Sequence, residues 1–170
     1  MLSPTIDLVD ALPRHTTKRY RTRPYSAITH VILHHSATLG GDPGSFARYH
    51  VEHNDWPGIG YHAVIARDGA RYKTNNDNTV SYHAGSWNRR AIGVCLVGDF
   101  TREEPTVEQL VAAGETVLNY ADVFNVPAEN IVGHKDIDPS TSCPGNFPLV
   151  KVIRAYVTGR RETKTSPTGG

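Results

Sequence analysis

Two short apolar runs constrain the fold of this chain more than any other feature of its sequence. The segments 29–35 and 92–97 each contain an unbroken run of small and aliphatic side chains, without alternation between apolar and polar positions. A strand with one face in water alternates in this way, whereas a strand covered on both faces is apolar throughout. We therefore expect two central strands in one sheet, with helices covering both of its faces.

Helix patterns lie between and after these strands. A helix is expected over residues 45–53, because Asp42 is a favourable N-cap and Pro43 suits the first helical position. A longer helix is expected to begin at Thr106, another favourable N-cap, and to continue with one apolar face. A final helix is expected over residues 149–156.

Shorter strands complete the expected sheet. Strand-like segments at 60–66 and 71–73 flank an Asp-Gly pair, which is typical of a hairpin. Residues 131–134 form a further short apolar segment. The sequence therefore predicts an α/β fold with a single mixed central β-sheet flanked by about three helices.

The length of 170 residues fits one domain with one core. Residues 1–25 contain three prolines and predict an irregular N-terminal arm. Residues 26–158 are expected to form the folded domain, and residues 159–170 a flexible tail or the beginning of a linker. The Thr, Ser, Pro and Gly content from residue 162 onward favours disorder in that tail.

Charge and hydropathy exclude several partners. The formal net charge is +1, so no overall field favours nucleic acid. The basic residues of the arm, among them Arg21 and Arg23, are interpreted as solvated. No run approaches 18 apolar residues, so we expect no membrane span. The first residues lack the pattern of a signal peptide, so the protein is expected to stay where it is made until something releases it.

The two cysteines lie in different surroundings. Cys95 falls within the apolar run 92–97, where a free cysteine behaves as a small core residue. Cys143 lies in a Ser-Cys-Pro-Gly loop that follows a histidine-rich segment. We therefore expect no disulfide between them.

Three residues suggest a metal centre. His34 stands at the end of a predicted central strand, His134 closes another short strand, and Cys143 follows nine residues later. Two imidazoles and a thiolate are the three protein ligands of a catalytic zinc site that keeps its fourth position open. This spacing alone is a weak indication, since hydrogen-bonded histidines beside a small buried cysteine give the same pattern.

The sequence motifs around these residues occur in the same order as in one protein family. They are Leu-His-His-Ser-Ala-Thr from residue 33, Gly-Tyr-His from 60, His-Ala-Gly-Ser-Trp-Asn from 83, Ile-Gly-Val-Cys-Leu-Val-Gly-Asp-Phe from 92, Gly-His-Lys-Asp-Ile-Asp-Pro from 133 and Cys-Pro-Gly from 143. From about residue 25 to 157 the sequence resembles the N-acetylmuramoyl-L-alanine amidases of the phage-lysozyme and peptidoglycan-recognition-protein type.

The resemblance implies a role for particular residues. It places one zinc ion on His34, His134 and Cys143, and it places Tyr61 and Thr141 beside the zinc-bound water and the scissile carbonyl. Some relatives carry a glutamate on the strand at 92–97, where this chain has Cys95.

Substrate contacts are expected from His83, Trp87 and Asn88. For His83 proton handling is the alternative, and for the other two a loop anchor is a comparable explanation. His35 and His62 alternate away from their neighbours and are expected to be structural. His50 and His53 are expected to be packing or surface residues. Asp136 and Asp138 either support His134 or shape its loop.

The function that this resemblance implies is zinc-dependent hydrolysis of the amide bond between N-acetylmuramic acid and L-alanine in bacterial peptidoglycan. We expect a monomeric phage endolysin, made in the host cytoplasm and acting on the cell wall after release. A peptidoglycan-binding recognition module without catalysis, and a cytosolic amidase that recycles muropeptides, are the alternatives.

Overall fold

A six-stranded mixed sheet forms the centre of the molecule in the computed structural model, which describes residues 3–165. The strand order is β1-β4-β3-β5-β2-β6, and every neighbouring pair is parallel except β3 and β4. The strands are β1 (Ile6–Asp7), β2 (His30–His35), β3 (Ala63–Ile65), β4 (Arg71–Lys73), β5 (Ala91–Leu96) and β6 (Ile131–Gly133).

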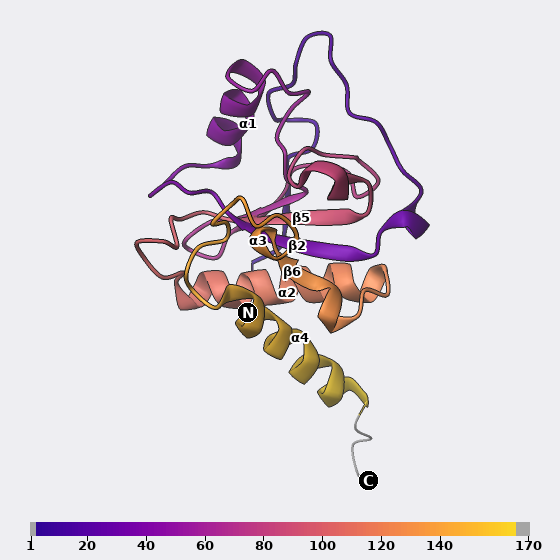
Figure 1. Cartoon of the computed structure of the whole chain (residues 1–170), viewed down its shortest axis with the longest axis vertical. Helices are drawn as coiled ribbons and strands as arrows, with labels where there is room; N and C mark the ends of the chain where they lie inside the picture. The colour runs from indigo at the N-terminus through magenta and orange to yellow at the C-terminus, as the bar shows by residue number, and fades with distance from the viewer. Residues whose placement is uncertain (1–2, 166–170) are drawn as a thin grey trace.

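Helices cover both faces of this sheet, as the apolar runs predict. Helix α1 lies on one face, and α2 and α4 lie on the other (Figure 1). The α-helices are α1 (Pro43–Glu52), α2 (Val107–Val123), α3 (His134–Ile137) and α4 (Leu149–Thr165); short 3-10 turns span Tyr25–Ala27, Gly85–Arg89 and Ala128–Asn130. The predicted fold class is confirmed, with the single-turn helix α3 added to the three that the sequence indicates.

Local signals in the sequence account for the ends of these elements. The Asp42 side chain accepts a hydrogen bond from the Ser45 N–H and caps α1, and Thr106 caps α2 by accepting from the Gln109 N–H. The predicted hairpin is present, because β3 and β4 pair antiparallel around the Asp-Gly turn. The two caps determine where α1 and α2 begin, and the turn determines how β3 and β4 pair.

The two central strands divide their side chains between two apolar layers. Val31 and Leu33 of β2 pack in the larger core with α2 and α4. His34 points to the opposite face, where Cys95 of β5 is its partner in the parallel register. Both positions are almost completely buried. The face that carries His34 is also the face that α1 covers.

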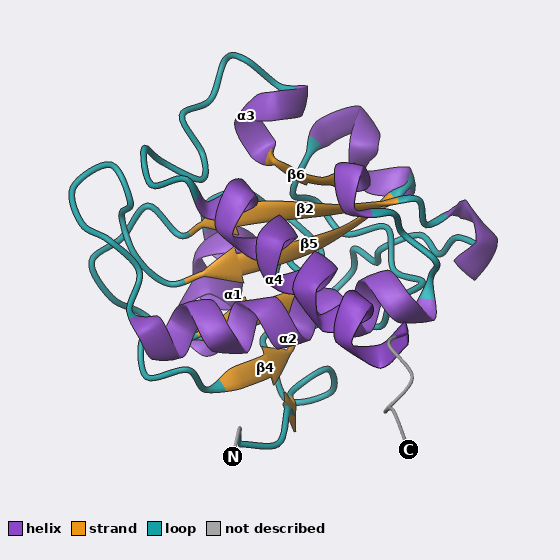
Figure 2. Cartoon of the chain, turned by 90° about the horizontal axis from the view of Figure 1, so that it is seen from below, coloured by secondary structure: helices purple, strands orange, loops and turns teal. Residues whose placement is uncertain are grey.

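The N-terminal arm is more integrated than its composition predicts. Strand β1 pairs with β4 at one edge of the sheet, near the N-terminus (Figure 2). The interpretation of the basic residues of the arm as solvated is wrong for Arg23, which is only 7% exposed. Its guanidinium donates hydrogen bonds to the carbonyls of Asn88 and Ala91, which replace the lost water.

The last helix is longer than the sequence predicts. Helix α4 continues to Thr165, so the expectation of disorder from residue 162 is wrong for residues 162–165. Arg161 and Lys164 both bond to the Asp122 carboxylate of α2, which holds these last turns against the domain. Residues 166–170 of the predicted tail lie outside the described part of the chain.

Between residues 3 and 165, no helix is both long enough and apolar enough to cross a membrane.

Candidate metal centre

The three predicted metal ligands come together at one end of the sheet. His34 lies near the carboxyl end of β2, and His134 begins α3 directly after β6. Because β2 and β6 are parallel neighbours, with Leu33 opposite Gly133, the two histidines are brought side by side, and their ring centroids are 4.7 Å apart. The loop after α3 adds Cys143, and the three ligand atoms lie within 4.8 Å of one another.

The chemistry and spacing of this group fit zinc. The Nδ1 of His34 lies 3.5 Å from the Sγ of Cys143. A tetrahedral zinc ion with Zn–N and Zn–S bonds of about 2.0 and 2.3 Å holds its nitrogen and sulfur ligands roughly 3.5 Å apart. Within residues 3–165, these three residues are the one group of histidine, cysteine and acidic side chains with this convergence.

Burial sets the protonation of these ligands. Desolvation lowers the pKa of His34 well below 6.5, and neighbouring His83 and His134 lower it further. Burial also lowers the pKa of His134, so both imidazoles are neutral near pH 7, as a metal requires of its ligands. Burial raises the pKa of the Cys143 thiol to about 11, and a bound cation reverses that effect.

Backbone contacts hold the cysteine loop in place. The Cys143 N–H donates to Thr141 Oγ1 at 3.1 Å, and the Cys143 carbonyl accepts from the Lys135 N–H at 2.7 Å. Gly145 has a φ of +99°, and a Cβ there would stand 2.5 Å from the Phe100 carbonyl carbon. Only glycine therefore fits at position 145, the last residue of the Cys-Pro-Gly motif.

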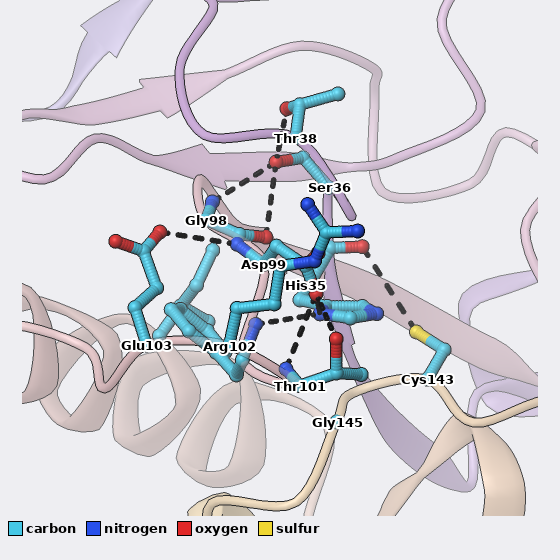
Figure 3. Close-up of polar contacts among 12 residues, drawn as sticks. His35, Ser36, Thr38, Gly98, Asp99, Thr101, Arg102, Glu103, Cys143 and Gly145 are labelled. Carbon is cyan, nitrogen blue, oxygen red and sulfur yellow. Dashed lines mark hydrogen bonds and ion pairs between the residues drawn. The ribbon is translucent and has the colours of Figure 1, made fainter.

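His35 supports the same loop from the opposite face of β2. Its carbonyl faces the Cys143 thiol at 4.0 Å (Figure 3). Its Nδ1 accepts a hydrogen bond from the Phe100 N–H at 3.1 Å. Beside it, Ser36 Oγ accepts from the Gly98 N–H at 2.9 Å and ties the end of β2 to the residues after β5. The structural role predicted for His35 is confirmed.

Tyr61 faces the metal centre. Its ring centroid is 5.4 Å from that of His34, across a tilted contact. Burial raises the pKa of Tyr61 well above 10, and the nearby Cys95 and Cys143 raise it further. The phenol is therefore a hydrogen-bond donor at neutral pH. Cys95 is fully buried and forms no disulfide, as predicted.

The three predicted substrate residues lie in the segment before β5. His83 is 7% exposed, and its Nδ1 lies 3.0 Å from the Nε2 of His34. The Asn88 Oδ1 accepts from the backbone N–H groups of His83 and Ala84, which is the loop-anchor role. Trp87 is half-buried and meets the His30 ring edge to face at 4.8 Å. His83 thus contacts His34 at Nε2, the ring nitrogen that does not face Cys143. Substrate contact by any of the three residues stays a prediction.

Other polar residues singled out by the sequence have structural partners. Asp136 accepts from the Gly133 N–H at 2.7 Å, and Asp138 accepts from the Ser140 N–H at 3.0 Å, so both shape the loop. His50 accepts from the Gly60 N–H, which confirms a packing role. His53 lies on the surface and stacks on the Tyr49 ring.

Sequence reasoning missed the role of one residue in this region, Arg23, and its expectation for His62 is confirmed. Arg23 is buried, and its Nη2 lies 3.3 Å from the Nε2 of His62. His62 is fully buried with its Nδ1 accepting from the Gly93 N–H, which is the structural role expected of it. The glycine inside the apolar run 92–97 is a further signal for this contact, because a glycine within a strand often marks the close approach of another group.

This fold and this ligand set define the class of protein. The chain belongs to the N-acetylmuramoyl-L-alanine amidase family, whose sequence model matches residues 24–146. Over 140 residues it is 30% identical to peptidoglycan recognition protein 1 of Bos taurus, and the alignment covers 77% of this chain and 73% of that protein.

Solved structures share the architecture. N-acetylmuramoyl-L-alanine amidase LysC from Clostridium intestinale URNW is 26% identical with a TM-score of 0.76, and the match covers 92% of this chain and 98% of that one. The Ph2119 endolysin from Thermus scotoductus MAT2119 bacteriophage Ph2119 shares the fold at 22% identity, with a TM-score of 0.77 and coverage of 91% and 99%.

Proposed function

We propose that this protein hydrolyses the amide bond between N-acetylmuramic acid and L-alanine in bacterial peptidoglycan, using one zinc ion held by His34, His134 and Cys143. The observation that carries this proposal is the convergence of the three ligand atoms within 4.8 Å of one another. Membership of the amidase family supports the reaction, and the presence of all three ligands favours catalysis over binding alone.

Zinc, when bound, lowers the pKa of water to about 7 and polarises a carbonyl group. Tyr61 stays protonated and donates a hydrogen bond to the negative charge that develops on the carbonyl oxygen. Thr141 Oγ1 already accepts from the Cys143 N–H, so its own hydrogen is free to be donated to the substrate or to water. Cys95 is no base, because burial raises the pKa of its thiol well above 9.

The biological role that we propose is lysis of the bacterial cell wall as a phage endolysin, acting after release from the host cytoplasm. An amidase from Clostridium intestinale and a phage endolysin are among the proteins with this fold. All three metal ligands come from one chain, so a monomer suffices for the reaction.

The ligand substitutions His134→Ala and Cys143→Ser test this proposal. Purified sacculi are digested with each variant, and the products are analysed by mass spectrometry for stem peptides that begin with L-alanine. We expect these peptides from the wild type and from the surface control His53→Gln, and none from the ligand variants. Activity of His134→Ala equal to that of the wild type contradicts the zinc mechanism.

The same assay separates the alternatives. A recognition module binds sacculi and releases no peptide. A recycling amidase cleaves soluble muropeptides and leaves intact sacculi uncut. We expect cleavage of intact sacculi, and its absence alongside cleavage of soluble fragments favours recycling.

A further inference from the structure

A second histidine stands directly behind a metal ligand. His83 is almost completely buried, at 7% exposure. Its Nδ1 lies 3.0 Å from the Nε2 of His34, and its Nε2 lies 3.4 Å from the carbonyl oxygen of Ala91 in β5. The ring therefore bridges a metal ligand and the backbone of the central sheet.

The carbonyl at one end of this bridge determines where the protons lie. A carbonyl oxygen only accepts hydrogen bonds, so the Nε2 of His83 carries a hydrogen. Arg23 donates to the same oxygen at 2.9 Å, and its positive charge disfavours a second charge on His83. A neutral imidazole has one N–H, so the Nδ1 of His83 is an acceptor.

The protonation of His83 determines that of the metal ligand His34. The Nε2 of His34 must donate to His83, which leaves the Nδ1 of His34 without a hydrogen. That bare nitrogen is the atom that lies 3.5 Å from the Cys143 sulfur. We propose that His83 is a positioning residue, which holds His34 in the one tautomer and ring orientation that presents Nδ1 to the metal. This inference rests on the proposed zinc site.

The seat of His83 is built to hold the ring in this place. A Cβ on Gly93 would stand 2.7 Å from both Cγ and Nδ1 of His83, so a side chain at this point in β5 would displace the ring. The Asn88 Oδ1 fixes the backbone N–H of His83 at 3.0 Å. The ring of His62 meets that of His83 edge-on, with centroids 5.7 Å apart. Strand, loop and neighbouring ring thus leave His83 one position.

The direct test is the protonation of the two rings in metal-free wild-type protein. Imidazole nitrogen NMR distinguishes a protonated ring nitrogen from a bare one. We expect a hydrogen on Nε2 in both His34 and His83, and a bare Nδ1 in both. A hydrogen on Nδ1 of either ring overturns the proposal. This measurement needs no variant and no metal.

Zinc affinity provides the second readout. In His83→Phe the ring shape stays but the acceptor is lost, and we expect the zinc dissociation constant to rise about 10- to 100-fold, as measured by competition with a chromophoric chelator. Gly93→Ala, which displaces the ring, is expected to have an effect in the same direction. The matched control His53→Phe changes a surface histidine and should bind zinc as the wild type does.

An affinity of His83→Phe equal to that of the wild type overturns the proposal. If His83→Phe does not fold, Gly93→Ala and the NMR measurement on the wild type decide the question. Neither readout involves amide cleavage, so failure of the positioning role and failure of the amidase proposal are distinguishable.

Discussion

The Nδ1 of His34 lies 3.5 Å from the Sγ of Cys143, although 109 residues separate them in the sequence. One residue belongs to the central strand β2, and the other to the loop that follows α3. A metal ion between them therefore joins the rigid sheet to a loop that is held otherwise by a few hydrogen bonds. Metal binding and the stability of the folded state should be coupled through this pair.

Zinc should raise the thermal stability of metal-free protein. A ligand at 100 times its dissociation constant stabilises the folded state by about 2.7 kcal/mol, which corresponds to a rise in Tm of roughly 5 to 10 °C for a chain of this size. Calorimetry of the stripped and reloaded protein measures this shift. Cys143→Ser should abolish most of it. An equal zinc-induced shift in wild type and Cys143→Ser would show that the metal binds elsewhere.

Loss of the Tyr61 hydroxyl should affect turnover and leave metal binding unchanged. Tyr61→Phe keeps the ring that lies 5.4 Å from His34 but removes the donor. We expect kcat on soluble muropeptide to fall about 10²- to 10³-fold, as for other single donors to an oxyanion. Zinc affinity, measured in parallel, should equal that of the wild type. An unchanged kcat would remove Tyr61 from the reaction.

A buried amide beside the central strands should matter for stability alone. Gln109 is fully buried, and its Nε2 donates to the carbonyls of Ile65 and Val97 at 3.0 and 2.9 Å. Gln109→Ala leaves the Val97 carbonyl unpaired, whereas the Ile65 carbonyl still accepts from the Val97 N–H at 2.9 Å. We expect the free energy of unfolding to fall by about 1–3 kcal/mol in urea denaturation. The control Asn119→Ala, at an exposed position of the same helix, should change it by less than about 0.5 kcal/mol. Equal values for the two variants would contradict this role.

The stability of the fold should fall in mild acid partly because of His50. Burial lowers the pKa of His50 from 6.5 to about 4, so the unfolded chain takes up a proton that the folded chain does not. The free energy of unfolding therefore decreases as the pH falls from 6.5 toward about 4. His50→Asn keeps an acceptor for the Gly60 N–H and removes the titrating group. Its stability should fall less steeply over this range. Parallel curves for the two proteins would show that His50 does not contribute.

The sheet and the metal ligands were predictable because their signals are local. The unbroken apolar runs indicate β2 and β5, and capping residues such as Asp42 and Thr106 mark the helix starts. The motifs around His34 and Cys143 identify the ligands through a family resemblance. The structure brings those ligands together. Their spacing in the sequence would not have sufficed.

The residues that support the ligands were not predictable in the same way. Arg23 looked like one of several solvated basic residues, because its carbonyl acceptors lie 65 and 68 residues away in the sequence. His83 was expected to contact substrate, because the family motif that begins with it indicates that it is near the site. The motif does not indicate on which side of His34 the ring lies. Both roles depend on how distant segments cross the sheet.

The central claim is that one zinc ion makes this protein an amidase. The most direct measurement is a titration of chelator-stripped protein with zinc, in which newly formed N-terminal alanine on purified sacculi is quantified at each step. We expect no new N-terminal alanine without metal, and a linear rise in its rate of formation that ends at one zinc ion per chain. Formation of N-terminal alanine that is unaffected by stripping, or none at any zinc concentration, would contradict this claim.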